Sequence, residues 1–258
     1  MILDDLVQAT RARLVKDKAA KSLATVQAES EHVGSLNPQA VYDSFLQPGI
    51  HIIGEVKKAS PSKGLIAPDF PYQQIARDYD QAGVAAISVL TEPDYFQGDL
   101  AYLEVIAGQV TAPVLRKDFI IDPYMIYQAK AAGAKIILLI VAILTPADLR
   151  VYFDLAQELG LAVLVEAHDE DEISQALAVG AQMIGVNNRN LKDFTVSFEN
   201  SQRLRNLVPP EVVFIAESGV KDPADVQALE KLGVNGVLVG EALMRSTDKA
   251  SFIAAAQG

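Results

Sequence analysis

Hydrophobic and polar positions alternate in blocks from Ile50 onward. Short runs rich in β-branched apolar residues are each followed by a longer amphipathic stretch. Buried parallel strands are continuous apolar runs, and the helices that cover them show a 3.6-residue period. The pattern therefore predicts eight strands, at residues 52–56, 85–90, 114–115 with their flanks, 136–140, 162–165, 183–186, 212–216 and 236–239.

The amphipathic stretches predict helices at residues 72–81, 124–132, 146–159, 170–179 and 223–232. A glycine follows each one, where a left-handed C′ position favours that residue: Gly83, Gly133, Gly160, Gly180 and Gly233. Three of these helices also have a start signal, an N-cap residue followed by proline: Asp122-Pro123, Thr145-Pro146 and Asp222-Pro223.

Eight strand–helix repeats of roughly 25 residues predict a single parallel (β/α)8 barrel, the TIM barrel, rather than an open doubly wound sheet. The sequence has no G-x-G-x-x-G motif and no break in composition, so residues 1–258 are expected to form one domain. Residues 1–49 precede the repeat. Their first apolar positions, from Ile2 to Leu14, have helical spacing, which predicts an N-terminal helical extension packed on the barrel.

Composition narrows the possible chemistry. The chain has no cysteine, which excludes disulfides, thiolate metal sites and cysteine nucleophiles. Its net charge of −11 disfavours binding to nucleic acid or acidic membranes, although a local basic pocket could still hold an anion. The acidic N-terminus differs from a secretory signal, so we expect a cytoplasmic protein. The longest apolar run, residues 136–144, is too short to span a bilayer.

The three histidines, His32, His51 and His168, lack metal-ligand spacing, so no metal is expected. His168 with Asp169 is expected to cap the helix that follows. The basic residues between Arg11 and Lys21 are typical of a solvated helix face, with a role near the barrel mouth left open.

Polar residues gather where the predicted strands end. In a parallel barrel, the loops that follow the strands carry function. A single Lys–Glu pair there can be structural, but several charges converging on a partly buried site are costly unless they serve one another or a ligand. The pattern therefore predicts an active site, drawn from Glu55, Lys57, Lys58, Lys117, Asp118, Glu166, Asn187, Asn188, Arg189, Glu217 and Ser218.

The last two predicted strands are followed by glycine-containing loops, at Gly219 and at Gly240-Glu241. In many barrels these loops bind phosphate through backbone amides and a short helix N-terminus, although both glycines could simply form turns. Ser60, in the loop 60–64 after the first strand, could bind phosphate from the opposite rim, and the rest of that loop could close over substrate.

The sequence contains five separated motifs: EVKKASPS at residues 55–62, SVLTEP at 88–93, LRKDF at 115–119, NNRNL at 187–191 and ESG at 217–219. Together, and in this order, they resemble the indole-3-glycerol phosphate synthase family. Two departures are modest: Ala167 stands where many relatives have valine, and Ser197-Phe198 replaces a more usual acidic–apolar pair. The resemblance runs from the N-terminal helix almost to the C-terminus.

The resemblance implies ring closure, decarboxylation and dehydration of 1-(2-carboxyphenylamino)-1-deoxyribulose 5-phosphate in tryptophan biosynthesis, without a cofactor. Lys117 corresponds to the family's general acid, Lys57 to a lysine near the substrate carboxylate, and Glu55 to its partner. The implied catalytic set is Glu55, Lys57, Lys117, Glu166, Asn187 and Ser218. The implied substrate-binding set is Ser60, Phe119, Leu138, Arg189, Glu217, Gly219, Gly240 and Glu241. The sequence leaves open which of Lys57, Lys117 and Glu166 acts in each proton transfer.

Three other functions remain possible on sequence grounds. One is a phosphate-binding aldolase in which Lys117 or Lys57 forms a Schiff base. Another is an isomerase of anionic sugars, because a phosphate grip does not identify the chemistry. The third is a binding barrel that has lost catalysis, which the complete set of strand-end residues disfavours. The oligomeric state and any contact with other tryptophan-pathway enzymes cannot be inferred from the sequence.

Overall fold

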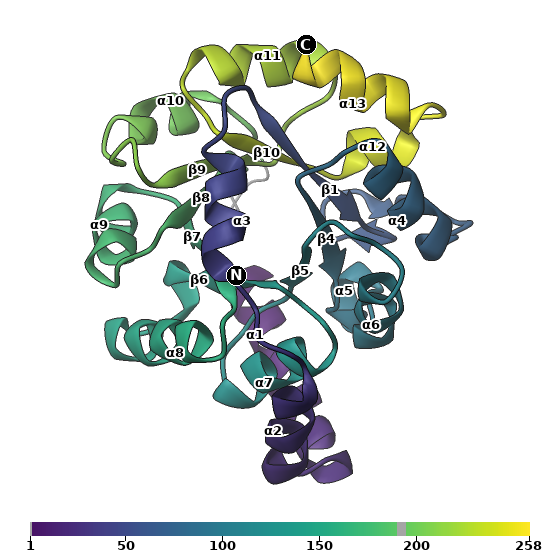
Figure 1. Ribbon diagram of the computed structural model, residues 1–258, viewed down its shortest axis with the longest axis vertical. Helices are drawn as coiled ribbons and strands as arrows, with labels where there is room; N and C mark the ends of the chain where they lie inside the picture. The colour runs from purple at the N-terminus through teal and green to yellow at the C-terminus, as the bar shows by residue number, and fades with distance from the viewer. Residues whose placement is uncertain (1, 190–194) are drawn as a thin grey trace.

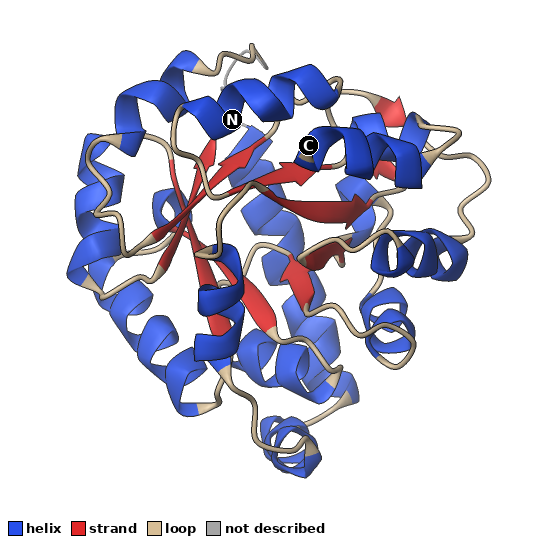
Figure 2. Ribbon diagram, turned by 45° about the horizontal axis from the view of Figure 1, so that its top comes forward, coloured by secondary structure: helices blue, strands red, loops and turns tan. Residues whose placement is uncertain are grey.

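The computed structural model describes residues 2–189 and 195–258, and its centre is a closed barrel of eight parallel strands (Figures 1 and 2). The barrel order is β1-β10-β9-β8-β7-β6-β5-β4. The strands are β1 (His51–Val56), β4 (Ala86–Leu90), β5 (Val114–Lys117), β6 (Ile136–Ile140), β7 (Ala162–Ala167), β8 (Met183–Asn187), β9 (Val213–Glu217) and β10 (Gly236–Val239). The predicted parallel barrel is confirmed, with strand ends displaced by at most two residues.

Helices surround the barrel, and two short strands, β2 (Ala59–Ser60) and β3 (Gly64–Leu65), form a hairpin after β1. Before β1 come α1 (Ile2–Ala20), α2 (Leu23–His32) and α3 (Pro38–Phe45). The others are α4 (Tyr72–Gln81), α5 (Pro93–Phe96), α6 (Leu100–Ala107), α7 (Pro123–Ala131), α8 (Pro146–Glu158), α9 (Glu170–Ala178), α10 (Glu199–Arg205), α11 (Pro223–Lys231), α12 (Glu241–Arg245) and α13 (Lys249–Gln257), with the 3-10 helix η1 (Val141–Ile143). In the part of the chain that the structure describes, no helix could cross a membrane.

The predicted helix boundaries are confirmed by their caps. The side chains of Asp122, Thr145 and Asp222 each accept a hydrogen bond from a backbone N–H in the first turn, with proline at the helix start. The five glycines that follow the predicted helices all have φ between 76° and 90°. Only glycine adopts this left-handed conformation at little cost, which is why the helix ends were readable from sequence.

The core has two layers, separated by the strands. Because side chains alternate along a strand, every second residue points into the barrel. The inward residues Ile53, Leu115, Leu164, Ile215 and Leu238 belong to one buried cluster inside the barrel. Their neighbours along the strands pack outward against the helices in a second, larger cluster.

The N-terminal extension contains three helices where one was clearly indicated by apolar spacing. Helix α3 crosses one end of the barrel in Figure 1 and places Val41, Tyr42 and Phe45 in the inner core. Tyr42 Oη accepts a hydrogen bond from the N–H of Val163, near the start of β7, at 2.8 Å. Helix α3 therefore closes the end of the barrel where the strands begin.

Helix α1 is fixed near the other end of the barrel by a buried charge network. Arg13 donates to Asp118 Oδ1 at 2.7 Å and to the carbonyl oxygen of Thr91 at 3.1 Å. Arg116, which points outward from β5, donates to Asp118 Oδ2 at 3.0 Å. Burial raises the pKa of Asp118, but the two guanidinium groups outweigh it and hold that pKa below its usual value. Arg13 is thus an anchor for α1 rather than part of a solvated face.

Candidate active site

Strand alternation carries the polar residues into the barrel at the ends of the strands. Each of them lies two positions beyond an inward residue of the core, so it points the same way. Ile53 is followed in this manner by Glu55, Leu115 by Lys117, Leu164 by Glu166, Gly185 by Asn187, and Ile215 by Glu217. The switch from apolar to polar at these positions marks where the core ends and the site begins.

A cavity of about 360 Å³ lies at this end of the barrel. All fourteen residues proposed from sequence line it: Glu55, Lys57, Ser60, Lys117, Phe119, Leu138, Glu166, Asn187, Arg189, Glu217, Ser218, Gly219, Gly240 and Glu241. Among the other strand-end candidates, Lys58 and Asn188 are not among the described lining residues. Asn188 instead accepts hydrogen bonds from the N–H and hydroxyl of Ser201. Asn190 and Leu191, from the NNRNL motif, lie outside the described residues.

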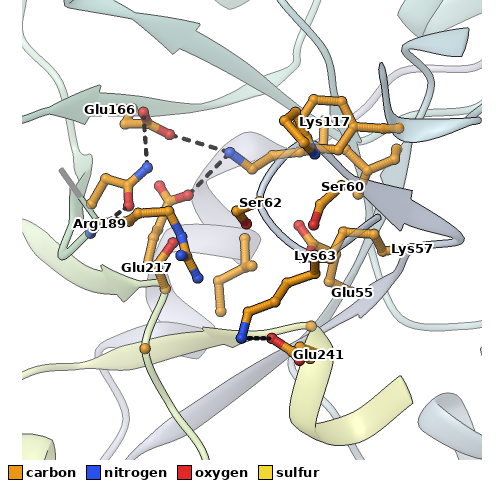
Figure 3. Close-up of a pocket in the computed structure, with 18 of the residues that line it drawn as sticks. Glu55, Lys57, Ser60, Ser62, Lys63, Lys117, Glu166, Arg189, Glu217 and Glu241 are labelled. Atoms are coloured by element: carbon orange, nitrogen blue, oxygen red, sulfur yellow. Dashed lines mark hydrogen bonds and ion pairs between the residues drawn. The ribbon is translucent and has the colours of Figure 1, made fainter. Parts of the chain in front are cut away.

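Lys117 lies between two carboxylates (Figure 3). Its Nζ is 3.2 Å from Glu166 Oε2 and 3.1 Å from Glu217 Oε2. Burial alone would lower the pKa of Lys117, but Glu217 and Glu166 outweigh burial and raise it above its ordinary value. Lys117 is therefore an ammonium group at neutral pH, with a proton to donate.

Glu166 has further polar neighbours that favour its ionised form. Asn187 Nδ2 lies 3.5 Å and His168 Nε2 lies 3.4 Å from Glu166 Oε1. Burial would raise the pKa of Glu166, but Lys117 and His168 outweigh it and lower that pKa. The predicted helix cap at this point holds for Asp169, which accepts from the N–H of Glu172. The ring of His168 also contacts Glu166 and Glu172, which the sequence did not reveal.

Glu217 has the less favourable surroundings of the two carboxylates. Burial, followed by repulsion from Glu166, raises its pKa to about 7 in spite of Lys117. Its Oε1 is buried and has no hydrogen-bond partner among the described residues. That oxygen occupies the space beside Gly185, where an added Cβ would lie 2.2 Å away. A glycine in the neighbouring strand therefore makes room for this carboxyl group.

A second lysine–glutamate pair lies on β1 and just after it. Lys57 Nζ donates to Glu55 Oε2. The pair packs against Gly240, where an added Cβ would lie 2.2 Å from Glu55 Oε2 and 2.7 Å from Lys57 Nζ. Gly240, the first residue after β10, thus leaves room for the ends of these two side chains.

The two rims of the cavity carry the elements proposed to hold phosphate. Ser218 and Gly219 follow β9 with φ of 66° and 100°, and positive φ is uncommon for serine. Gly240 is the N-cap residue of α12 and has no side chain to cap the first amides of that helix. From the opposite rim, Lys63 Nζ lies 3.4 Å from a Glu241 carboxylate oxygen (Figure 3). Ser60, in the short hairpin after β1, is buried beside them.

The sequence predicted only part of the apolar side of the cavity. Phe119 and Leu138 were proposed from sequence, and Phe96 stands beside Phe119 with ring centroids 6.2 Å apart. Leu3 and Leu6 of α1 also line the cavity. The helical spacing of these two leucines was visible in the sequence, but nothing local indicated that they would contact the site rather than the outside of the barrel.

Comparison with known proteins gives matches over nearly the whole chain. The profile of the indole-3-glycerol phosphate synthase family matches residues 3–256. Relatives with that name from Leuconostoc mesenteroides and Lacticaseibacillus paracasei are each 55% identical, over 100% and 99% of this chain and 99% and 98% of their own. A 3-hexulose-6-phosphate synthase from Salmonella typhimurium shares the fold alone, with a TM-score of 0.67 and 15% identity over 81% of this chain and 97% of its own. The chain belongs to the indole-3-glycerol phosphate synthase family.

Proposed function

We propose that this cavity closes the indole ring of 1-(2-carboxyphenylamino)-1-deoxyribulose 5-phosphate and releases carbon dioxide and water, giving indole-3-glycerol phosphate for tryptophan biosynthesis. The activity is that of a carboxy-lyase and follows from membership of the family. The observation that carries the residue assignment is Lys117, an ammonium group held by two carboxylates inside a cavity with one apolar side.

The substrate fits the cavity in one direction. Its phosphate belongs at the rim formed by Gly219 and Gly240, where glycine leaves backbone amides accessible. Its aromatic ring belongs against Phe119 and Leu138, and its carboxylate near Lys57. Holding the two ends of a flexible substrate brings the ring carbon to the ketone, which removes much of the entropic barrier to closure.

Ring closure needs an acid at the ketone oxygen. As the aromatic carbon that bears the carboxylate attacks the ketone, that oxygen becomes negative, and Lys117 donates a proton to it. Loss of carbon dioxide then returns an electron pair to the ring system, where the attack had left an iminium. Because the electrons remain within the substrate, this sequence is redox-neutral.

Dehydration needs an acid for the departing hydroxyl group and a base for a proton of the new ring. Lys57 and Glu166 both line the cavity and are the candidates. Glu166 suits the base, because its neighbours hold it ionised. Lys57 with its partner Glu55 suits proton transfer on the other side of the cavity.

The direct test is a fluorescence assay for the indole product with the carboxyphenylamino substrate. Wild-type protein is expected to turn over. Lys117→Ala is expected to lose about a thousandfold in kcat, a typical contribution of a positioned acid, while still binding the phosphate-bearing product. Turnover by this variant at the wild-type rate would refute the role of Lys117.

A Schiff-base aldolase is the alternative that uses the same lysines. Borohydride added with a carbonyl substrate would trap a covalent adduct on Lys117 or Lys57 in an aldolase. We expect no adduct by mass spectrometry. The high pKa of Lys117 supports this expectation, because a Schiff-base lysine must be deprotonated to attack.

The N-terminal extension, residues 1–49, is also assigned a part in covering the substrate. Leu3 and Leu6 line the cavity and Arg13 anchors their helix. We further infer that residues 1–258 act as one domain, in the cytoplasm, on an anionic small molecule and without binding nucleic acid.

A further inference from the structure

His168 packs between Glu166 and a carboxylate on the next helix. Its Nδ1 lies 3.1 Å from Glu172 Oε2, which also accepts the backbone N–H of His168 at 2.7 Å. Its Nε2 is buried, 3.4 Å from Glu166 Oε1, and has no hydrogen-bond acceptor among the described residues. His168 is not one of the described residues that line the cavity. Its influence on the reaction must therefore pass through Glu166.

The two carboxylates beside Lys117 have unequal surroundings. Glu166 contacts Lys117 through one oxygen and has Asn187 and His168 at the other. Glu217 contacts Lys117 through one oxygen, while its other oxygen lies beside Gly185 without a hydrogen-bond partner among the described residues. Cations and donors favour the carboxylate form, and a dry, unpartnered oxygen favours the neutral acid. The geometry thus separates the protonation of two otherwise similar groups.

Other groups around His168 favour its cationic form. Burial would lower the pKa of His168, but Glu172 and Glu166 outweigh burial and raise it to about 9. Among the described residues, the charged groups that act on His168 are Glu166 on β7, Glu172 on α9 and Glu217 on β9. Lys117 on β5 and the neutral Asn187 on β8 reach it only through Glu166, and Asn200 on α10 donates to the His168 carbonyl oxygen at 3.3 Å. In this described set, three carboxylates surround the imidazole and one ammonium group lies behind Glu166.

We propose that His168 is a positioning residue whose imidazolium keeps Glu166 ionised, so that Glu217 is the carboxyl group that takes up the exchangeable proton beside Lys117. This inference rests on the proposed function. Glu166 then remains ionised and available as a base while Glu217 binds the proton. Because the two groups interact, their protons come off in two coupled steps, and His168 sets the order.

The kinetic test compares pH profiles of kcat/KM for wild type, His168→Gln and the control His32→Gln, whose histidine is exposed on α2. Removing the cation should make Glu166 harder to ionise, so the acidic limb of His168→Gln moves up by about one pH unit. On the acidic limb we therefore expect kcat to fall about tenfold with KM unchanged, because His168 does not contact substrate, whereas at higher pH, where Glu166 is ionised in both proteins, the two rates should agree. An unmoved acidic limb, or a higher KM with intact kcat, would overturn the inference.

Glu172→Gln tests the source of the imidazolium. Without this carboxylate, His168 should lose its proton at lower pH. The acidic limb of Glu172→Gln should stay near its wild-type position, because a histidine with an ordinary pKa is still protonated at that pH. A limb displaced as far as that of His168→Gln would overturn the assignment of the effect to the imidazolium.

A titration of the unliganded protein separates failure of this inference from failure of the proposed function. The chain has three histidines, so His168→Gln identifies the imidazole NMR signal of His168 by its loss. That signal should titrate near pH 9 in wild type and at least one unit lower in Glu172→Gln. An ordinary titration in wild type would overturn the role of His168 whatever the turnover, whereas a normal shift with no indole product would refute only the proposed function.

Infrared difference spectra locate the stored proton. A band of a neutral carboxyl group should disappear as the pH rises through about 7, and Glu217→Gln should remove this band. If Glu166→Gln removed the band instead, the order of protonation would be the reverse of the one proposed.

Discussion

Where the strands begin, the barrel is filled by Val41, Tyr42 and Phe45 of α3, whereas where the strands end it holds a cavity with paired lysines and glutamates. Both ends are lined by inward-pointing residues of the same eight strands. At the closed end these positions carry buried apolar side chains, and Phe45 also contacts His51 edge-on with ring centroids 5.6 Å apart. At the open end they carry charge that must be neutralised locally. We therefore expect substitutions at the first end to change stability and substitutions at the second end to change activity.

Among the substitutions that test the difference between the two ends, Glu166→Gln is expected to have the largest effect on kcat. Glu166→Gln keeps the shape of the side chain but removes the proposed base and one charged partner of Lys117. We expect kcat to fall about 10² to 10⁴-fold, the range for a lost acid–base group. The exposed Glu158→Gln on α8 is the control and should keep wild-type turnover. A loss below threefold for Glu166→Gln would remove Glu166 from the mechanism.

At the closed end, Phe45→Ala should act on stability alone. Phe45 is fully buried, and its truncation leaves a cavity among the starts of the strands, which typically costs about 3–5 kcal/mol. Chemical denaturation measures this change, with Val151→Ala, exposed on α8, as the control. We expect kcat of the folded variant to stay within a factor of two of wild type. A large drop in kcat without loss of stability would show that the two ends are not separate.

The open end should also give the protein a pH-dependent stability. The raised pKa of His168, about 9, means that its contribution to stability is complete below its ordinary value and is lost as the pH rises to about 9. The raised pKa of Glu217 has the same sign, but its effect ends near pH 7. Between pH 7 and 9, wild type should lose about 1–3 kcal/mol of unfolding free energy that His168→Gln does not lose. Parallel denaturation curves for the two proteins would contradict this.

The smallest expected effect is at Gly240. In Gly240→Ala the new methyl group would meet Glu55 and Lys57, whose flexible side-chain ends can shift at some cost to geometry. We expect kcat/KM to fall about tenfold, since a displacement on the order of 1 Å in a site is enough for that. Gly108→Ala is the matched control, because an added Cβ there meets nothing closer than 3.7 Å. Equal effects of the two substitutions would indicate a general backbone effect.

Much of the fold could be predicted from local signals. Apolar runs located all eight barrel strands, and cap residues such as Asp122 and Gly133 located the helix ends, because both depend on neighbours in sequence. Helix α3 could not be assigned in this way. Its buried residues Tyr42 and Phe45 have as partners the starts of strands far along the chain, such as Val163, and no local pattern records that contact.

The residues of the site can likewise be separated into those that the sequence predicts and those that it does not. Residues at strand ends, such as Lys117 and Glu217, were predictable because barrel closure fixes where strand ends meet. Resemblance to the family supplied their proposed roles. Leu3, which lines the cavity from α1, and the ring of His168, which faces Glu166, were not predictable. Both positions depend on the angle at which one element lies on another, which spacing along the sequence does not contain.

Consecutive residues at the end of strand β5 face opposite sides of the barrel wall. Lys117 points into the cavity, while Arg116 just before it and Asp118 just after it join the network that holds Arg13 of α1. Detaching α1 would therefore uncover the cavity and loosen the support of the lysine in one event, while the eight strands kept their hydrogen bonds. On gradual heating, the protein would lose activity before the barrel unfolded. Its upper working temperature would then be set by the attachment of one helix rather than by the stability of the barrel.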